Sequence, residues 1–181
     1  MLDAPDRAHT PYRVVCAGSL LGWSGWAYHL ERYTDINTAG PYFAAAFALQ
    51  ALMLCMMAAT SGQAPQARLS TRAGLTIVGL GVIAYPLLTP ASGRPWTQAE
   101  VFGIAPDPTV VATLGMLLAL RSHWILWPIP VVWCLASGAT LMALRVGHAW
   151  LLPAIAGIAI AAGLLSMRPS VSINSTTNSL P

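Results

Sequence analysis

The sequence predicts an all-α fold, a polytopic transmembrane helical bundle with about six spans and both termini in the cytoplasm. Three observations support this fold class. Hydrophobic residues make up 56% of the 181 residues, charged residues make up only 8%, and the mean hydropathy is +0.61; a soluble domain carries about 25% charged residues. Six apolar stretches fill most of the chain, and arginine is distributed unevenly among the polar connections between them.

A helix needs roughly 20 apolar residues to cross the hydrocarbon core of a bilayer, and the stretches 13–28 and 108–121 are short by this measure. The predicted spans cover about residues 13–28, 41–59, 74–91, 108–121, 124–144 and 149–167. Together they form a single transmembrane domain, residues 1–168. The Ser, Thr and Asn content of residues 169–181 predicts a disordered cytoplasmic tail.

The stretch 13–28 contains Gly18 and Gly22 in a G-x-x-x-G spacing, which allows membrane helices to approach closely. A signal peptide is the competing interpretation of this stretch. No A-x-A cleavage pattern follows Tyr28, so we expect the stretch to remain as an anchor.

The next two stretches each contain residues that are unusual in a membrane helix. Gln50 lies deep in 41–59, and we expect it to form a hydrogen bond across a helix interface. Pro86 and Pro90 lie in 74–91, where each frees a backbone carbonyl that a neighbouring helix must satisfy.

The stretch 108–121 is short, and a re-entrant segment is the alternative to a full crossing. Its start is nevertheless well marked, because Asp107 is suited to cap the helix and Pro108 to occupy its first position. The stretches 124–144 and 149–167 are longer apolar runs. Prolines near their starts predict irregular backbone there, at Pro128, Pro130 and Pro153.

The distribution of arginine predicts the orientation, since cytoplasmic loops carry an excess of positive residues. The larger set of arginines lies on the side of both termini and comprises Arg7, Arg13, Arg68, Arg72, Arg121 and Arg168. The smaller set comprises Arg32, Arg94 and Arg145. The termini are therefore predicted to be cytoplasmic.

Two polar connections share the extracytoplasmic face in this topology and form the candidate binding site. Four of the six acidic residues lie on that face, so Arg32 and Arg94 are surrounded by carboxylates. We expect Arg94 to lie within ion-pair reach of one of them, although weak pairing of exposed charges at loop ends is the simpler interpretation. The candidate substrate-binding residues are Glu31, Arg32, Tyr33, Asn37, Arg94, Trp96, Glu100 and Asp107.

A metal site is a weaker hypothesis for the same face. His29 and His148, with the nearby carboxylates, form a ligand set suited to zinc or a similar cation. No helix carries two of these ligands at i, i+3 or i, i+4 spacing, so three loops would have to converge. A place in the interfacial aromatic belt also accounts for His29 and its neighbours without a function. We therefore expect no cofactor.

Two sequence runs carry a resemblance to a known family. The first is Gly25-Trp26-Ala27-Tyr28-His29, followed by Glu31-Arg32-Tyr33, Ile36-Asn37 and the run from Pro41 to Phe47. The second is Gly93-Arg94-Pro95-Trp96, followed by Glu100, Phe102-Gly103 and the run from Ala105 to Thr109. They resemble an uncharacterised family of bacterial multi-spanning membrane proteins, domain of unknown function family 6064, over most of residues 20–120. The resemblance implies a bacterial inner-membrane location and no particular activity.

The leading hypothesis is a membrane protein that binds or transports a small polar solute through the extracytoplasmic loop site, with Arg32 and Arg94 as charged contacts. The alternative is an accessory subunit that docks into a larger membrane complex. A membrane enzyme that uses His29 and His148 is less favoured. The expected partners are the lipid bilayer, a solute, and a complex partner or a second copy; nucleic acid is not expected, because the formal charge of +3 comes from scattered arginines.

Overall fold

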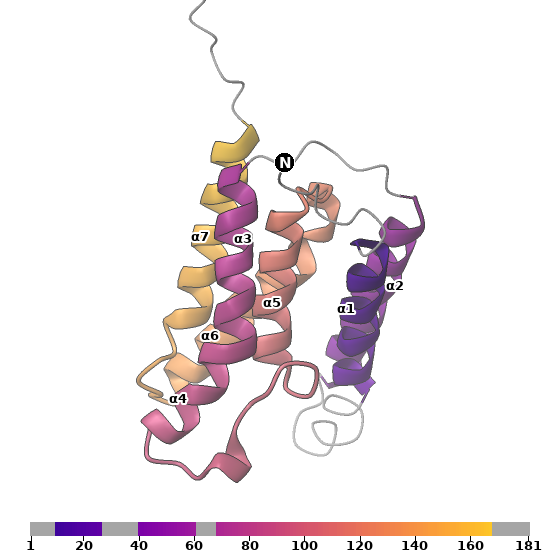
Figure 1. The fold of residues 1–181 in the computed structure, drawn as a ribbon. Coiled ribbons are helices and arrows are strands. Elements are labelled where there is room, and N and C mark those ends of the chain that lie inside the picture. Colours follow the sequence, from indigo (N-terminus) through magenta and orange to yellow (C-terminus); the bar gives the residue numbers. More distant parts are fainter. Residues whose placement is uncertain (1–9, 27–39, 61–67, 168–181) are drawn as a thin grey trace, which may run out of the picture.

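The computed structural model describes residues 10–26, 40–60 and 68–167. Within these ranges the chain forms helices joined by turns and short loops, without a strand, which confirms the predicted all-α class (Figure 1). The helices are α1 (Thr10–Ser24), α2 (Gly40–Thr60), α3 (Arg68–Gly79), α4 (Tyr85–Ala91), α5 (Pro106–Ala119), α6 (Pro128–Ala143) and α7 (Leu151–Met167). Short 3-10 turns occur at Trp96–Gln98 and Trp124–Leu126. The predicted tail, residues 169–181, lies outside the described residues.

Three helical runs in the described part of the chain are long and apolar enough to cross a membrane: Gly40–Ala58, Ser70–Ala91 and Trp124–Ala143. Pro106–Ala119 and Leu151–Ser166 are apolar but shorter. The outer surface of the bundle exposes large hydrophobic side chains, among them Leu52, Ile83, Val132 and Ile158. Exposed apolar surface of this kind is consistent with association with a membrane.

The helices α3 and α4 form one continuous rod despite Pro86. A proline in a helix lacks a backbone donor, and its ring crowds the preceding turn. At Leu80–Ala84 the helix widens to π-type geometry, in which the Tyr85 N–H donates to the Leu80 carbonyl. The wider turn accommodates Pro86 without ending the rod, and Tyr85 remains buried.

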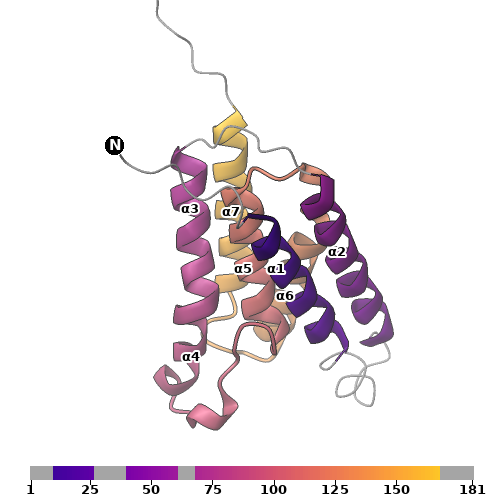
Figure 2. The ribbon, with the colours of Figure 1, turned by 45° about the vertical axis from the view of Figure 1, so that its right-hand side comes forward.

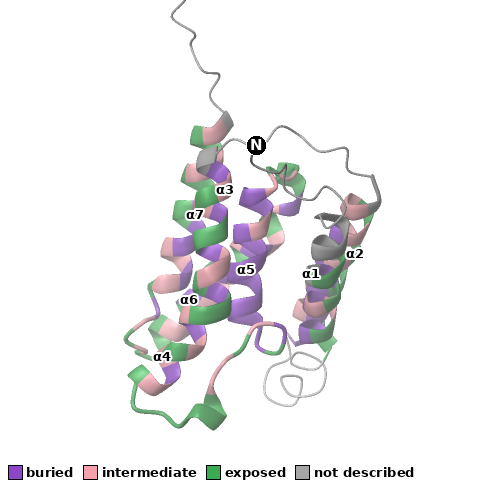
Figure 3. Cartoon of the chain, in the orientation of Figure 1, coloured by how far each residue is buried: buried purple, intermediate pink, exposed green. Residues whose placement is uncertain are grey.

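The helix α5 lies at the centre of the fold, where every residue except Met116 is buried (Figure 3). Glycines bring α3 into direct contact with it. A Cβ atom added to Gly74 would lie 2.5 Å from the carbonyl oxygen of Gly115, and one added to Gly115 would lie 2.6 Å from that of Gly74. The two backbones therefore touch, as they do in small-residue packing between membrane helices.

The helices α1 and α2 lie side by side at one edge of the bundle (Figures 1 and 2). Gly18 of the predicted G-x-x-x-G spacing belongs to their interface, because an added Cβ would lie 3.1 Å from the Ala51 carbonyl oxygen. Gln50 on α2 is buried, and its Nε2 donates to the Leu126 carbonyl at 3.1 Å. The predicted hydrogen bond of Gln50 across a helix interface is therefore confirmed.

Candidate functional site

Asp107 lies in the first turn of α5 and is only 7% exposed. The helix begins at Pro106, with Ala105 as its N-cap residue. Pro106 and Pro108 carry no N–H group, so the first turn leaves fewer donors unpaired than usual. The expectation that Asp107 caps this helix, with Pro108 at its first position, is wrong. Ala105 provides no side-chain cap, and the Asp107 carboxylate accepts hydrogen bonds from other helices.

Hydrogen bonds of Thr109 and Ser24 fix the loop that leads into α5. Thr109 Oγ1 accepts from the Gly103 N–H at 2.8 Å and donates to the Ala105 carbonyl at 2.6 Å. Ser24 Oγ, on α1, donates to the Ile104 carbonyl at 3.3 Å. Gly103 has a φ of 83°, and a Cβ there would lie 2.9 Å from a side-chain atom of α1. The loop is therefore anchored both to α5 and to α1.

Three neutral side chains donate hydrogen bonds to the Asp107 carboxylate. Trp133 Nε1 and Ser137 Oγ, both on α6, lie 2.8 Å from Oδ1. Ser137 Oγ also lies 2.9 Å from Oδ2, and Tyr85 Oη donates to Oδ2 at 3.1 Å. We call these four residues the Asp107 cluster. Its members come from α4, α5 and α6, so the carboxylate joins three helices.

Aromatic side chains of α2 hold Trp133 in position. The rings of Phe43 and Phe47 each meet the indole edge-on, with ring centroids 5.1 Å apart in both pairs. Edge-to-face pairs of this kind contribute about 0.5–1.5 kcal/mol beyond their buried area. The indole of Trp133 is therefore held by aromatic contacts with α2 as well as by its hydrogen bond to Asp107.

Glu100 provides a second carboxyl group near Asp107. It is half-buried in the loop between α4 and α5. Burial raises the pKa of Glu100 above its ordinary value, the negative charge of Asp107 raises it further, and the positive charge of Arg94 opposes both effects. His148, half-buried just before α7, interacts electrostatically with Asp107. The site is thus acidic, with basic groups at its margin.

The model of a family of unknown function (DUF6064) matches residues 7–174. The chain belongs to the DUF6064 family. This confirms the resemblance found in the sequence, and the match includes the whole Asp107 cluster. No curated protein matches the chain, and no solved structure matches it.

In this DUF6064 chain the structure describes four of the predicted substrate-binding residues. Asp107 is buried and Glu100 is half-buried, whereas Arg94 and Trp96 are exposed in the loop that follows α4. Trp96 is 61% exposed and so does not enclose a pocket within the described residues. The other four predicted residues are Glu31, Arg32, Tyr33 and Asn37, which lie outside the described residues.

The predicted ion pair of Arg94 is not formed with either carboxylate that the structure describes. Asp107 accepts its hydrogen bonds from the neutral donors of its cluster, and Arg94 acts on Glu100 through its charge alone. The other two expected partners, Glu31 and Asp35, lie outside the described residues. Arg94 is therefore better placed at the margin of the acidic site than at its centre.

The metal hypothesis gains no support from the described part of the chain. No group of three or more His, Cys, Asp and Glu side chains there has an arrangement suited to a metal ion. His148 is near Asp107, but His29 lies outside the described residues. The three cysteines, Cys16, Cys55 and Cys134, are free thiols.

The sequence interpretation missed Tyr85, Trp133 and Ser137 as partners of Asp107. A signal for two of them was present, because Trp133 and Ser137 are four residues apart and so lie on one face of a helix. A polar pair of donors on one face of an otherwise apolar span indicates a buried acceptor on a neighbouring helix.

Proposed function

We propose that this protein is a multi-pass protein of the bacterial inner membrane that binds a small, positively charged solute at an acidic site and transports it. The membrane location is supported by the three apolar helical runs of spanning length. Asp107 and Glu100 provide the negative charge of the site. Arg94 and Trp96 belong to its entrance. Glu31, Arg32, Tyr33 and Asn37, which the sequence predicts as further binding residues, lie outside the described residues.

The observation that carries the proposal is the burial of the Asp107 carboxylate. Moving a carboxylate from water into a low-dielectric interior costs several kcal/mol, even after the protein relaxes. Neutral donors recover part of this cost, and the N-terminal dipole of α5 also favours an anion. Among the described residues, none of the donors to Asp107 is a basic side chain. A bound cation would neutralise the charge that these neutral donors leave on the carboxylate.

The depth of the cluster within the helices also supports the proposal. Beyond Tyr85, α4 continues to Ala91, and beyond Ser137, α6 continues to Ala143. Six further residues at 1.5 Å per residue place both helix ends about 9 Å beyond the cluster. Ionisable groups within apolar helical segments are costly, and in membrane proteins they mark the pathways of ions and substrates.

An accessory role in a larger membrane complex is the second candidate. It is favoured by the loop after α4, where residues 92–98 are all exposed and include Trp96. Exposed aromatic side chains are enriched at protein interfaces. This role predicts that other polypeptides co-purify with the protein in mild detergent, and that Trp96→Ala releases them. A protein that purifies as a monomer or homo-oligomer contradicts it.

A thermal-shift screen of the purified protein tests the proposed site. The probes are Na⁺, ammonium, ethanolamine and choline, compared at constant ionic strength with glucose and acetate. A ligand at 100 times its Kd stabilises the folded protein by about 2.7 kcal/mol, so a bound cation raises the melting temperature. Asp107→Asn is expected to reduce the shift strongly and Glu100→Gln to reduce it less. The proposal fails if no cation shifts the wild type, or if Asp107→Asn shifts equally.

Reporter fusions test the membrane topology separately. Fusions after Ala64 and after Gln98 are expected to report the cytoplasm and the periplasm, respectively. The opposite pattern would move the acidic site to the cytoplasmic side. A cytoplasmic report from both fusions would contradict a crossing between these two positions.

A further inference from the structure

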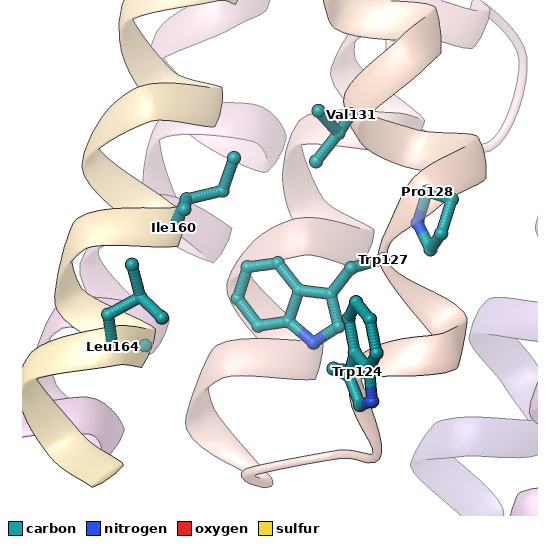
Figure 4. Close-up of a pocket in the computed structure, with 7 residues that line it drawn as sticks. Trp124, Trp127, Pro128, Val131, Ile160 and Leu164 are labelled. Atoms are coloured by element: carbon teal, nitrogen blue, oxygen red, sulfur yellow. The ribbon is translucent and has the colours of Figure 1, made fainter. Parts of the chain in front are cut away.

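A second feature of the fold is an apolar cavity of about 340 Å³ between α6 and α7 (Figure 4). Trp124, Trp127 and Val131 line it from the side of α6, and Ile160 and Leu164 line it from α7. Its wall is apolar, and none of the residues of the Asp107 cluster contributes to it. It is therefore separate from the acidic site.

The absence of a side chain at Gly163 helps to create this cavity. A Cβ atom added there would lie 3.5 Å from Cη2 of the Trp127 indole, which is an ordinary contact distance. The indole extends from α6 toward α7, as Figure 4 shows. Trp124 is 70% exposed and Leu164 is 61% exposed, so the cavity opens on the outer surface of the bundle. In a membrane, this surface faces lipid.

A basic side chain lies at the end of α7 that borders the cavity. Arg121 follows α5, and its Nη2 donates to the carbonyl of Ser166 at 3.1 Å. Ser166 is only two residues after Leu164, which lines the cavity. A cation at a helix C-terminus is favoured by the helix dipole. Apolar contact surface and positive charge are thus found side by side.

This combination is typical of a lipid site. Basic pockets between transmembrane helices on the cytoplasmic side bind the headgroups of anionic lipids. Arg121 belongs to the arginine-rich side of the predicted topology, and the tryptophans Trp124 and Trp127 are residues typical of the membrane interface. A volume of about 340 Å³ with an apolar wall suits a hydrocarbon chain.

We propose that the cavity holds one acyl chain of an anionic phospholipid, with the headgroup phosphate beside Arg121. The proposal rests on the membrane location in the proposed function and is independent of the acidic site. An acyl chain in this cavity contacts residues of both α6 and α7.

Native mass spectrometry of the delipidated full-length protein tests this proposal. The probes are phosphatidylglycerol and phosphatidylethanolamine with identical acyl chains. The expected result is one tightly bound lipid, with phosphatidylglycerol preferred about fivefold, as one nearby cation predicts. Gly163→Leu fills the cavity and is expected to remove the bound lipid. Gly157→Leu is the matched control on the same helix, since Gly157 is exposed and has no atom within 4 Å of an added Cβ.

Arg121→Gln is a second variant, at an exposed position where folding is expected to be preserved. It is expected to retain the lipid but lose the preference for phosphatidylglycerol. The proposal is overturned if Gly163→Leu binds lipid like the wild type, if the wild type binds none, or if Arg121→Gln keeps the full preference. A wild-type dimer that Gly163→Leu dissociates would assign the cavity to a second copy instead. Asp107→Asn is expected to bind lipid normally, which separates this result from the test of the acidic site.

Discussion

Replacing Ser137 by alanine should weaken the Asp107 cluster by a predictable amount. Ser137 Oγ lies 2.8 Å and 2.9 Å from the two oxygens of Asp107, so its single proton serves both. A hydrogen bond to a charged group contributes about 1.5–3 kcal/mol to stability. The substitution removes one oxygen atom and leaves little empty volume. We therefore expect Ser137→Ala to lower the free energy of unfolding by about 1.5–3 kcal/mol.

A double-mutant cycle with Asp107→Asn shows whether this loss acts through the carboxylate. Without the charge, the Ser137 hydrogen bond is worth only about 0.5–1.5 kcal/mol, so the two substitutions should couple by about 1 kcal/mol or more. The assay is equilibrium unfolding in mixed micelles, followed by circular dichroism. Thr140→Ala is the matched control, since the exposed Thr140 hydroxyl donates within α6 to the Ala136 carbonyl. Its free energy of unfolding is expected to change by less than about 0.5 kcal/mol. If Ser137→Ala lowers the free energy of unfolding equally in the wild type and in Asp107→Asn, the hydroxyl does not act through the carboxylate.

Two other predictions concern the helix contacts and the acidic loop. Gly115→Ala should destabilise the protein by about 1–3 kcal/mol, because its Cβ would meet backbone atoms of α3 at 2.6 Å; Gly79→Ala, with no atom within 4 Å, should stabilise the helix by about 0.5–1 kcal/mol. Equal melting temperatures for the two variants would contradict the close contact. Because the folded protein raises the pKa of Glu100 above 4.5, it holds this proton more tightly than the unfolded chain does. Stability should then fall as pH rises from 4.5 through the raised pKa and level off above it, and Glu100→Gln should flatten this slope in unfolding titrations. An unchanged slope in Glu100→Gln would assign the pH dependence to other groups.

The helices were predictable because their signals are local. Apolar stretches of sufficient length predict helices without knowledge of what they contact, and the G-x-x-x-G spacing correctly marked Gly18 as an interface residue. The effect of Pro86 was harder to foresee. A proline in a helix normally frees a carbonyl and interrupts the helix. Here a single π-type turn at Leu80–Ala84 accommodates Pro86 within a continuous helical rod.

The partners of Asp107 depend on the rotation of helices about their axes, which the local sequence does not determine. The rules for helix starts correctly located the beginning of α5 near Asp107, but they gave the side chain a capping role. Its true donors lie 22, 26 and 30 residues away, on α4 and α6. The predicted ion pair of Arg94 stays a prediction with respect to Glu31 and Asp35, which lie outside the described residues, while Arg94 itself is exposed.

The most direct test of a cation-binding acidic site is a binding isotherm, measured by titration calorimetry with the cation that gives the largest thermal shift. A charge-assisted contact is worth about 1.5–3 kcal/mol, so Asp107→Asn should weaken binding by about 10-fold to 100-fold. Arg94→Gln, at the exposed margin, should change Kd by less than about threefold, as expected for an exposed charge. Equal affinities in the wild type and Asp107→Asn, with both proteins folded, would contradict the assignment of Asp107 as the binding group.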